Sequence, residues 1–265
     1  MTSTEPASID LNSDLGESFG VWERGADESL LQVISSANLA CGFHAGDPNV
    51  MRATVAVAKR NGVAVGAHPG YPDLLGYGRR RMELEPSHLR NYVLYQMGAL
   101  GAFLAAAGLR MHHVKPHGAL YVAALEDNAV ARSIAEAAAE YQEGLAVYTL
   151  AGSEMWHAAE RAGLRAVPEF FADRPLRSDG SVVMFGWQEV FEPAPETVAA
   201  RVRSLVTTGK VASVEGGEVA VVANTICVHS DTPSAADIGR AVRRTLEDSR
   251  LRVTAEPATG LGLRR

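Results

Sequence analysis

The sequence predicts an α/β protein built on a parallel sheet. Short β-like runs followed by amphipathic helical segments cover nearly all of the 265 residues, and this alternation is typical of strands joined by crossover helices. Hydrophobic residues make up 47% and charged residues 21% of the chain, which indicates a well-buried core and excludes a disordered protein. The length is compatible with one unit, because α/β barrels commonly reach ~250 residues in a single domain.

Seven segments are predicted to be strands, each an apolar or β-branched run bounded by turn residues. They are Ser8–Asn12, Val33–Cys41, Ala64–His68, His113–Lys115, Ala146–Leu150, Ala166–Glu169 and Val219–Val228.

Helix signals fill the gaps between these strands. Asp47-Pro48 and Thr232-Pro233 each combine an N-cap residue with proline at the first helical position. Pro86 opens a long amphipathic segment that Gly108 closes. Three shorter helices, each followed by a glycine, are predicted at Asn128–Tyr141, Ser153–Ala162 and Glu196–Thr207.

Charge and composition exclude several classes of partner. The formal net charge is −6, and a general binder of nucleic acid or of anionic membranes is expected to be basic. The longest apolar run, Gly98–Leu109, is much shorter than the ~20 residues that span a bilayer. Because no secretory signal is visible, we expect a cytoplasmic protein in which Cys41 and Cys227 stay reduced. Both cysteines are predicted to be small core residues rather than nucleophiles.

Unusual polar residues follow the strands rather than precede them. The segments Pro69–Glu85 and Phe170–Pro195 are long and polar, whereas the segments that lead from helices into strands are short. In α/β barrels and doubly wound sheets, the carboxyl ends of the strands carry the functional site. We therefore expect the site at these exits.

Strand alternation places Asp10, Asn12 and Asp14 on one face of the first strand, although an Asx-rich turn would explain the same run. Histidines stand at four other strand exits, in a chain with only eight. Each alone could be a structural residue, but together they indicate a cleft for acid–base chemistry or a divalent metal. The converging set is Asp14, His44, His68, Lys115, His117 and His229.

Two loops add charged groups to this rim. Arg79 and Arg80 follow a Gly-Tyr-Gly turn and are interpreted as an anion clamp, with a solvated basic turn as the alternative. Glu169, Asp173 and Arg174 leave the sixth strand, where a salt bridge between Asp173 and Arg174 is the simpler interpretation.

In this order, the motifs resemble the LamB/YcsF family, whose members form the A component of the prokaryotic ATP-dependent 5-oxoprolinase. The resemblance runs from residue 9 to about 231. The matching blocks are IDLNSDLGESFG, ANLACGFHAGDP, GAHPGYPD with GYGRR, VKPHGALY, EFFADR with SDG, and ICVHSD. It implies an irregular (β/α)7 TIM-like barrel similar to the glycoside hydrolase/deacetylase superfamily. We thus expect one barrel domain over 1–265, with short tails at 1–7 and about 255–265.

The resemblance also implies an activity, the cleavage of 5-oxo-L-proline to L-glutamate coupled to hydrolysis of ATP to ADP and phosphate. ATP would be a co-substrate, two further components of the enzyme (B and C) would be partners, and a homo-oligomer is compatible with the sequence. The chain departs from the family pattern at Val122, at Val182–Trp187 and at Ser230, which bears on substrate details.

Two alternatives remain open: a metal-dependent deacetylase or amidohydrolase, and a non-catalytic protein that binds a small molecule within a complex. For the metal, the candidate ligands are Asp14, His44 and His68. Catalysis is assigned to Asp14, His44, Lys115, His117 and His229. Binding of substrate or phosphate is assigned to Asn12, His68, Arg79, Arg80, Glu169, Asp173 and Arg174.

Overall fold

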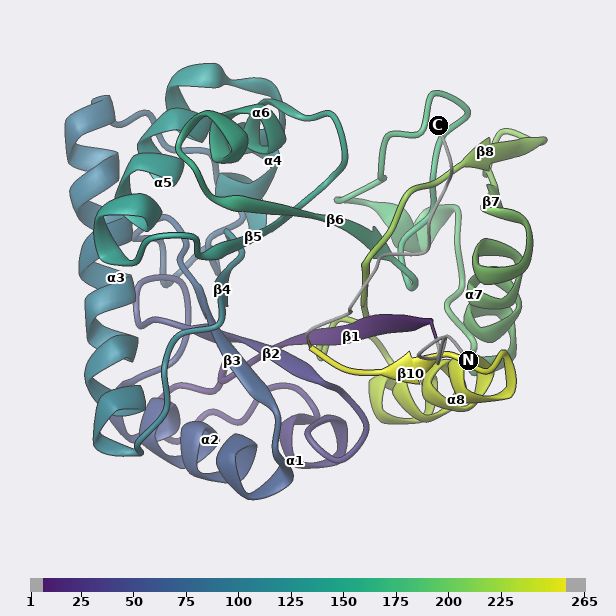
Figure 1. Ribbon diagram of the computed structural model, residues 1–265, viewed down its shortest axis with the longest axis horizontal. Helices are drawn as coiled ribbons and strands as arrows, with labels where there is room; N and C mark the ends of the chain where they lie inside the picture. The colour runs from purple at the N-terminus through teal and green to yellow at the C-terminus, as the bar shows by residue number, and fades with distance from the viewer. Residues whose placement is uncertain (1–6, 256–265) are drawn as a thin grey trace, which may run out of the picture.

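Seven parallel strands form a closed barrel in the computed structural model, which describes residues 7–255 (Figure 1). The strands pair in chain order, and β9 then pairs with both β6 and β1, which closes the sheet. The predicted tails at 1–7 and about 255–265 lie outside the described residues except for Ala7 and Ala255. The barrel strands are β1 (Ser8–Leu15), β2 (Ser36–Ala40), β3 (Ala64–His68), β4 (His113–Val114), β5 (Ala146–Thr149), β6 (Arg165–Phe171) and β9 (Thr225–Cys227).

Helices surround this barrel. In Figure 1, α1 and α2 lie below it, α3 to α6 on the left and at the upper left, and α7 with α8 on the right. Neighbouring helices also pack on each other, α3 on α5 and α7 on α8. The helices are α1 (Asp27–Leu30), α2 (Pro48–Asn61), α3 (Pro86–Ala106), α4 (Gly118–Glu126), α5 (Asn128–Tyr141), α6 (Glu154–Arg161), η1 (Trp187–Glu189, a 3-10 turn), α7 (Pro195–Thr208) and α8 (Ala235–Asp248).

Local sequence signals account for several helix ends. The Asp47 carboxylate accepts hydrogen bonds from the first backbone N–H groups of α2, and Gly62 ends that helix with a φ of +67°. Asp127 and Ser153 cap α5 and α6 in the same way. The start predicted at Thr232-Pro233 differs, because α8 begins at Ala235 after Ser234 adopts a left-handed conformation.

The last predicted strand is two strands in the structure. Residues 218–220 form β8 (Glu218–Ala220), which pairs antiparallel with β7 (Lys210–Ala212), and only Thr225–Cys227 enters the barrel. The sequence patterns also missed α1, α4 and the short strand β10 (Arg252–Val253), which pairs with β1. The elements α1 and β10 carry too few residues to show a hydrophobic period, whereas α4 is apolar on nearly all sides and so lacks the polar face that marks an amphipathic helix.

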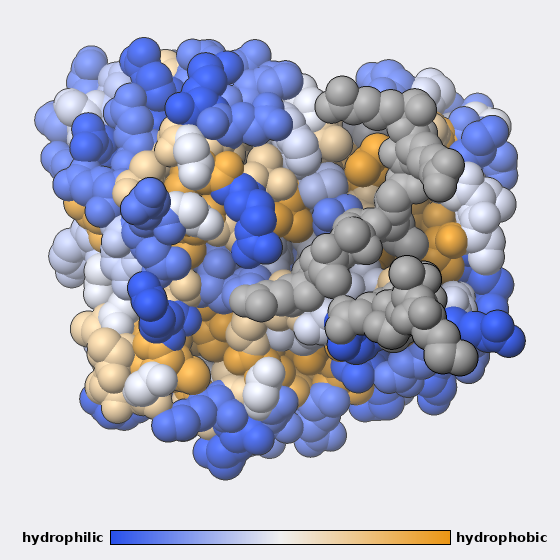
Figure 2. Space-filling view, viewed as in Figure 1, coloured by the Kyte–Doolittle hydropathy of each residue, from blue (hydrophilic) through white to orange (hydrophobic). Residues whose placement is uncertain are grey.

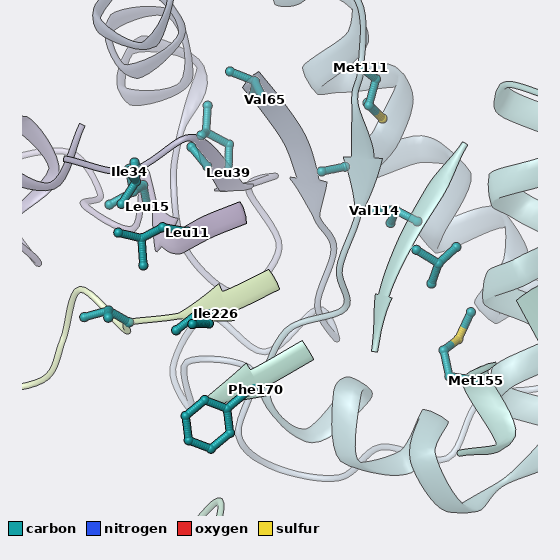
Figure 3. Close-up of a cluster of buried hydrophobic side chains, with 14 of the residues drawn as sticks. Leu11, Leu15, Ile34, Leu39, Val65, Met111, Val114, Met155, Phe170 and Ile226 are labelled. Carbon is teal, nitrogen blue, oxygen red and sulfur yellow. The ribbon is translucent and has the colours of Figure 1, made fainter. Parts of the chain in front are cut away.

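The hydrophobic core lies between the strands and the helices. Leu11, Leu39, Val114, Phe170 and Ile226 come from five different strands and are fully or almost fully buried (Figure 3). In Figure 2, hydrophilic residues cover most of the outer edge of the visible face, whereas apolar residues show nearer its middle. The helices thus present their polar sides to solvent.

The interior of the barrel is polar, unlike the branched apolar filling usual in such barrels. Asp10 accepts hydrogen bonds from the hydroxyls of Ser36 and Thr225 at 2.7 and 2.6 Å. Above this layer, Asn38 donates to Asn12 at 2.8 Å, and the His113 ring lies 2.6 Å from the Asn38 side-chain oxygen. Alternation along β1 therefore directs Asp10, Asn12 and Asp14 inward, as the sequence predicted.

In the described part of the chain, helices lack the combination of length and apolar character needed to cross a bilayer.

Candidate active site at the barrel mouth

A small cavity opens at the carboxyl ends of the strands. Its volume is about 40 Å³. Seven of the predicted site residues line it: Asp14, His68, Arg79, Lys115, His117, Arg174 and His229. Tyr121, Phe171, Met184 and Phe185 complete much of the wall. Segments that are far apart in the sequence therefore meet around one opening, as expected from their positions at strand exits.

Asp14 lies at the centre of this group. One carboxylate oxygen accepts a hydrogen bond from the Lys115 ammonium at 3.0 Å. The other lies 3.4 Å from His68 Nε2 and 3.7 Å from His229 Nε2. Burial opposes the charge on Asp14, but His68 and Lys115 outweigh it and hold the pKa of the carboxyl well below its usual value. Asp14 is therefore a permanent anion at neutral pH.

Lys115 joins two carboxylates below the cavity. Its ammonium lies 2.9 Å from Glu169 Oε1 and 3.1 Å from the Cys227 sulfur, in addition to Asp14. Burial disfavours the charge, but the carboxylates of Asp14 and Glu169 raise the pKa of Lys115 well above its ordinary value. All three ammonium protons have acceptors, so Lys115 acts on the cavity through its charge.

Glu169 and Asn12 support this lysine from beneath. Glu169 also accepts hydrogen bonds from Asn12 at 3.1 Å and from the Tyr121 hydroxyl at 3.2 Å. Neither Glu169 nor Asn12 is among the residues that line the cavity. We infer that both position Lys115 rather than touch a ligand.

His229 is oriented by Asp173. Its Nδ1 lies 2.8 Å from the Asp173 carboxylate, which also accepts from the His229 backbone N–H at 3.0 Å. Burial opposes the charge on Asp173, yet Arg174 and His229 lower the pKa of its carboxyl far below the usual value. Because Nδ1 faces Asp173, Nε2 is the ring nitrogen of His229 that is left to face Asp14 and the cavity.

The predicted pairing of Asp173 with Arg174 is present at 3.0 Å, together with the His229 contact. Arg174 also lies 3.4 Å from Asp231, and the same carboxylate accepts a hydrogen bond from Arg79 at 2.5 Å. Arg79 and Arg174 therefore place two cations at the rim.

Arg80 lies apart from this group. Its side chain is 65% exposed and forms an ion pair with Asp73, and it does not line the cavity. The loop places adjacent arginines in different environments, a distinction that the Arg-Arg-Arg sequence does not contain.

Glu17, His44, His68 and His117 form a second cluster next to the cavity. One donor atom from each residue lies within 4.8 Å of the others. The His44 and His117 rings are stacked with centroids 3.7 Å apart, and burial lowers the pKa of both histidines well below the usual value. The three predicted metal ligands are divided, because Asp14 instead groups with Cys227 and His229.

Sequence reasoning overlooked three residues of the site. Glu17 stands three positions after Asp14 in the same exit, Tyr77 lies between two glycines, and Cys227 precedes His229 by two positions on the same strand face. Strand alternation could have found Cys227. Its sulfur was correctly predicted to be buried, and burial raises the pKa of this thiol well above its usual value.

A family model described as LamB/YcsF family matches residues 9–260. The chain belongs to the LamB/YcsF family. Its fold agrees with the solved structure of the lactam utilization protein of Thermus thermophilus, with a TM-score of 0.89 and 46% identity over 94% of this chain and all of that one.

Two relatives with curated names are also similar to this chain. The A subunit of the 5-oxoprolinase of Thermococcus onnurineus is 49% identical over 245 residues, which is 92% of this chain and 96% of that protein. The protein of the same name from Syntrophobacter fumaroxidans is 49% identical over 246 residues, 93% of this chain and 97% of its own. Both names denote a component of a multi-subunit enzyme.

Proposed function

We propose that this chain is the A subunit of an ATP-dependent 5-oxoprolinase, which cleaves 5-oxo-L-proline to L-glutamate while ATP becomes ADP and phosphate. The observation that carries the proposal is the Asp14 carboxylate at the cavity, bound by Lys115 and flanked by His68 and His229. Relatives 49% identical over most of their length bear the corresponding name.

The chemistry requires an activated lactam, because resonance makes its carbonyl carbon a poor electrophile. Attack of the lactam oxygen on the γ-phosphorus of ATP forms an O–P bond and releases ADP. Water then adds to the ring carbon, its proton goes to a base, and the C–N bond breaks as the nitrogen takes up a proton. A second water cleaves the resulting acyl phosphate to glutamate and phosphate.

The residues at the cavity match these steps. His229, whose Nε2 faces the cavity, is the base that accepts the water proton, while Asp14, 3.7 Å away, stabilises the imidazolium that forms. Arg79, which is 40% exposed, binds the substrate carboxylate or the phosphoryl group. The Lys115 charge stabilises the developing oxyanion without a direct bond.

The size of the cavity bears on where ATP binds. Its volume of about 40 Å³ is far below the ~300–1,000 Å³ typical of ligand pockets, so neither 5-oxoproline nor the much larger nucleotide fits it unless the wall moves. Met184 and Phe185, from the segment between β6 and α7, form part of the cavity wall. This favours a nucleotide site supplied by, or shared with, the partner proteins of the complex.

The surface around the mouth supports docking of those partners. Exposed apolar side chains stand on loops that leave the carboxyl ends of three strands: Val21 and Trp22 after β1, Leu74 and Leu75 after β3, and Phe185 and Val190 after β6. Leu75 is 97% exposed and Trp22 70%. Large apolar residues so exposed next to a cavity are typical of an interface.

The test is a coupled assay of ADP and glutamate in a mixture of this chain with the B and C components. We expect both products in equal amounts, none when this chain is omitted, and a loss of at least 100-fold for Asp14→Asn and His229→Ala. Asp237→Asn, an exposed carboxylate on α8, is the matched control and should keep full activity.

The outcomes separate the alternatives. Glutamate formed without ATP would replace the proposal with a metal-dependent amidohydrolase. Full activity of both site variants would instead indicate a protein that binds a small molecule while the chemistry occurs in a partner.

A further inference from the structure

The cluster of Glu17, His44, His68 and His117 meets the reaction proposed above only through His68, which lies 3.4 Å from Asp14. All four side chains are buried, with exposures between 0 and 5%. They come from the exits of four consecutive barrel strands, β1 to β4, and His68 and His117 also line the cavity.

Fixed ring orientations direct ring nitrogens into the centre of this cluster. His68 Nδ1 lies 2.7 Å from the Lys115 carbonyl oxygen, and His117 Nε2 lies 2.9 Å from the Tyr77 carbonyl oxygen. Since a carbonyl only accepts, each of these nitrogens carries the proton. The remaining nitrogens, His68 Nε2 and His117 Nδ1, then face each other at 3.0 Å, and His68 Nε2 also lies 3.4 Å from the Asp14 carboxylate.

Further polar atoms at the same place have no hydrogen-bond partner in the described part of the chain. Glu17 Oε1 and both ring nitrogens of His44 are buried without a hydrogen bond in the described part of the chain. Buried polar atoms are rarely left unsatisfied, and each such atom calls for an explanation. One cation at the centre of the cluster would be a partner for Glu17 Oε1 and for one nitrogen each of His44, His68 and His117.

The spacing suits a transition metal. Ligands about 2.1 Å from a tetrahedral ion stand about 3.4 Å apart. The separations are 3.5 Å between His117 Nδ1 and Glu17 Oε1, and 3.7 Å between His44 Nε2 and Glu17 Oε1. The stacked His44 ring must tilt to point at the same ion as His117, and it is the ring that no hydrogen bond holds in the described part of the chain.

The surrounding contacts have the pattern found around metal sites. Two ligand rings donate their outer N–H groups to backbone carbonyls, and the second oxygen of Glu17 accepts from the Tyr77 hydroxyl. Glycines leave room for the rings, since a Cβ at Gly70 would lie 2.6 Å from His44 Nδ1.

The other group with donor atoms in range, Asp14, Cys227 and His229, is already neutralised. The Lys115 ammonium lies 3.0 Å from Asp14 and 3.1 Å from Cys227, so a positive charge occupies that position. A second cation there would be repelled.

We propose that Glu17, His44, His68 and His117 bind one divalent transition-metal ion, of the class that prefers imidazole ligands, such as Zn²⁺. The ion lies beside the cavity wall, within reach of an oxygen atom of a bound substrate. The inference rests on the proposed function where it makes the ion a Lewis acid, since a substrate oxygen would be a fifth ligand, but its binding test does not depend on catalysis.

The experiment uses the full chain, stripped with a chelator and dialysed. Titration with Zn²⁺, followed by calorimetry, is expected to show one ion bound per chain, and Co²⁺ is expected to give visible d–d absorption. Glu17→Gln and His117→Gln should each weaken Zn²⁺ binding at least 10-fold. Cys227→Ala, from the other group, and His157→Ala, an exposed histidine, should bind as the parent chain does.

Circular dichroism of each variant shows whether it folds. If a variant does not fold, Zn²⁺ binding by the unaltered chain still tests the proposal. The proposal is overturned if the parent chain takes up no Zn²⁺ or Co²⁺, or if Glu17→Gln and His117→Gln bind as tightly as the parent. A chain that binds Zn²⁺ but forms no glutamate with its partners overturns the proposed function alone.

Discussion

Lys115 is the residue on which the centre of the barrel depends. Its side chain is 2% exposed and lies between Asp14 and Glu169, which are 8% and 0% exposed. Removing one partner from such a buried group leaves charges without a counter-charge. The stability lost in this way is larger than the net stability that the intact ion pairs contribute. Lys115 is therefore both a structural and an electrostatic element of the site.

We expect Lys115→Met to lower the free energy of unfolding by about 3–5 kcal/mol, because it leaves two carboxylates buried without their cation. Denaturant unfolding of the isolated chain measures this. The exposed Lys210→Met is the control and should change stability by less than about 0.5 kcal/mol. Adding Glu169→Gln to Lys115→Met should cost less than the sum of the two single changes, and simple additivity would contradict the coupling.

Asp27 gives the stability a dependence on pH. Burial raises the pKa of this carboxyl to about 6, and the charge of Glu17 adds to the effect. Below about pH 4 the folded and unfolded states both hold the proton. Between pH 4 and 6 only the unfolded state loses it, so stability falls as the pH rises through this range.

Asp27→Asn removes this loss of stability, because the amide is neutral at every pH. In the parent chain the Gly16 N–H lies 2.8 Å from the Asp27 carboxylate, and the amide oxygen of the variant can accept the same hydrogen bond. The variant should match the parent near pH 4 and be more stable by about 1–3 kcal/mol at pH 7. Unfolding free energies at both pH values test this, and a difference that does not change with pH would refute it.

At the scale of elements, the loop between β3 and α3 separates two adjacent arginines. Arg79 lies over the Tyr77 ring, 5.0 Å from its centroid, and lines the cavity, while Arg80 turns outward to Asp73. The turn that makes this separation contains Tyr77 at a φ of +54°, followed by Gly78 at +65°. Local backbone conformation thus decides which arginine can meet a substrate.

Arg79→Gln should raise KM for 5-oxoproline about 10-fold or more, since it removes a charge-assisted hydrogen bond to an anion. Arg80→Gln, one residue along the same loop, should leave KM within about twofold. Initial rates of the reconstituted enzyme at varied 5-oxoproline provide the comparison. Equal effects of the two variants would show that the loop rearranges when substrate binds.

For the whole molecule, the apolar residues around the mouth predict where the partner proteins dock. The double variant Trp22→Asp and Leu75→Asp should weaken association with the B and C components at least 10-fold, because both large side chains would be buried at the interface. Val222→Asp is the control, since this exposed valine precedes β9 at the other end of the barrel. Pull-down or calorimetry measures binding, and an equal effect of Val222→Asp would refute the assignment.

Much of the fold could be predicted from local patterns. Alternation in β1, the Asp47 cap of α2 and the glycine that ends it all act within a few residues, so the sequence displays them directly. The position of the histidines at strand exits predicted a shared opening for the same reason, because parallel strands end at one edge. By contrast, the break between β8 and β9 follows from pairing with β7 and β6, which no local period encodes.

The residues that line the cavity and those that support them could not be separated in advance. His44 and His68 stand in similar sequence surroundings, yet only His68 reaches Asp14. The sequence patterns did not single out Glu17, although it contributes to the cluster an oxygen that has no hydrogen bond in the described part of the chain. Such distinctions depend on which side chains from different strands come within a few ångströms.

The sequence by itself determined the alternation of strands and helices, the inward face of β1 and the end of the sheet at which polar chemistry gathers, since these depend on near neighbours along the chain. Only the tertiary structure decided that Lys115 neutralises Asp14 and Glu169, that Asp173 orients His229, and that four lone pairs meet beside the cavity. Closure of the barrel sets these contacts, because it brings together residues up to about two hundred positions apart whose distances no local rule constrains.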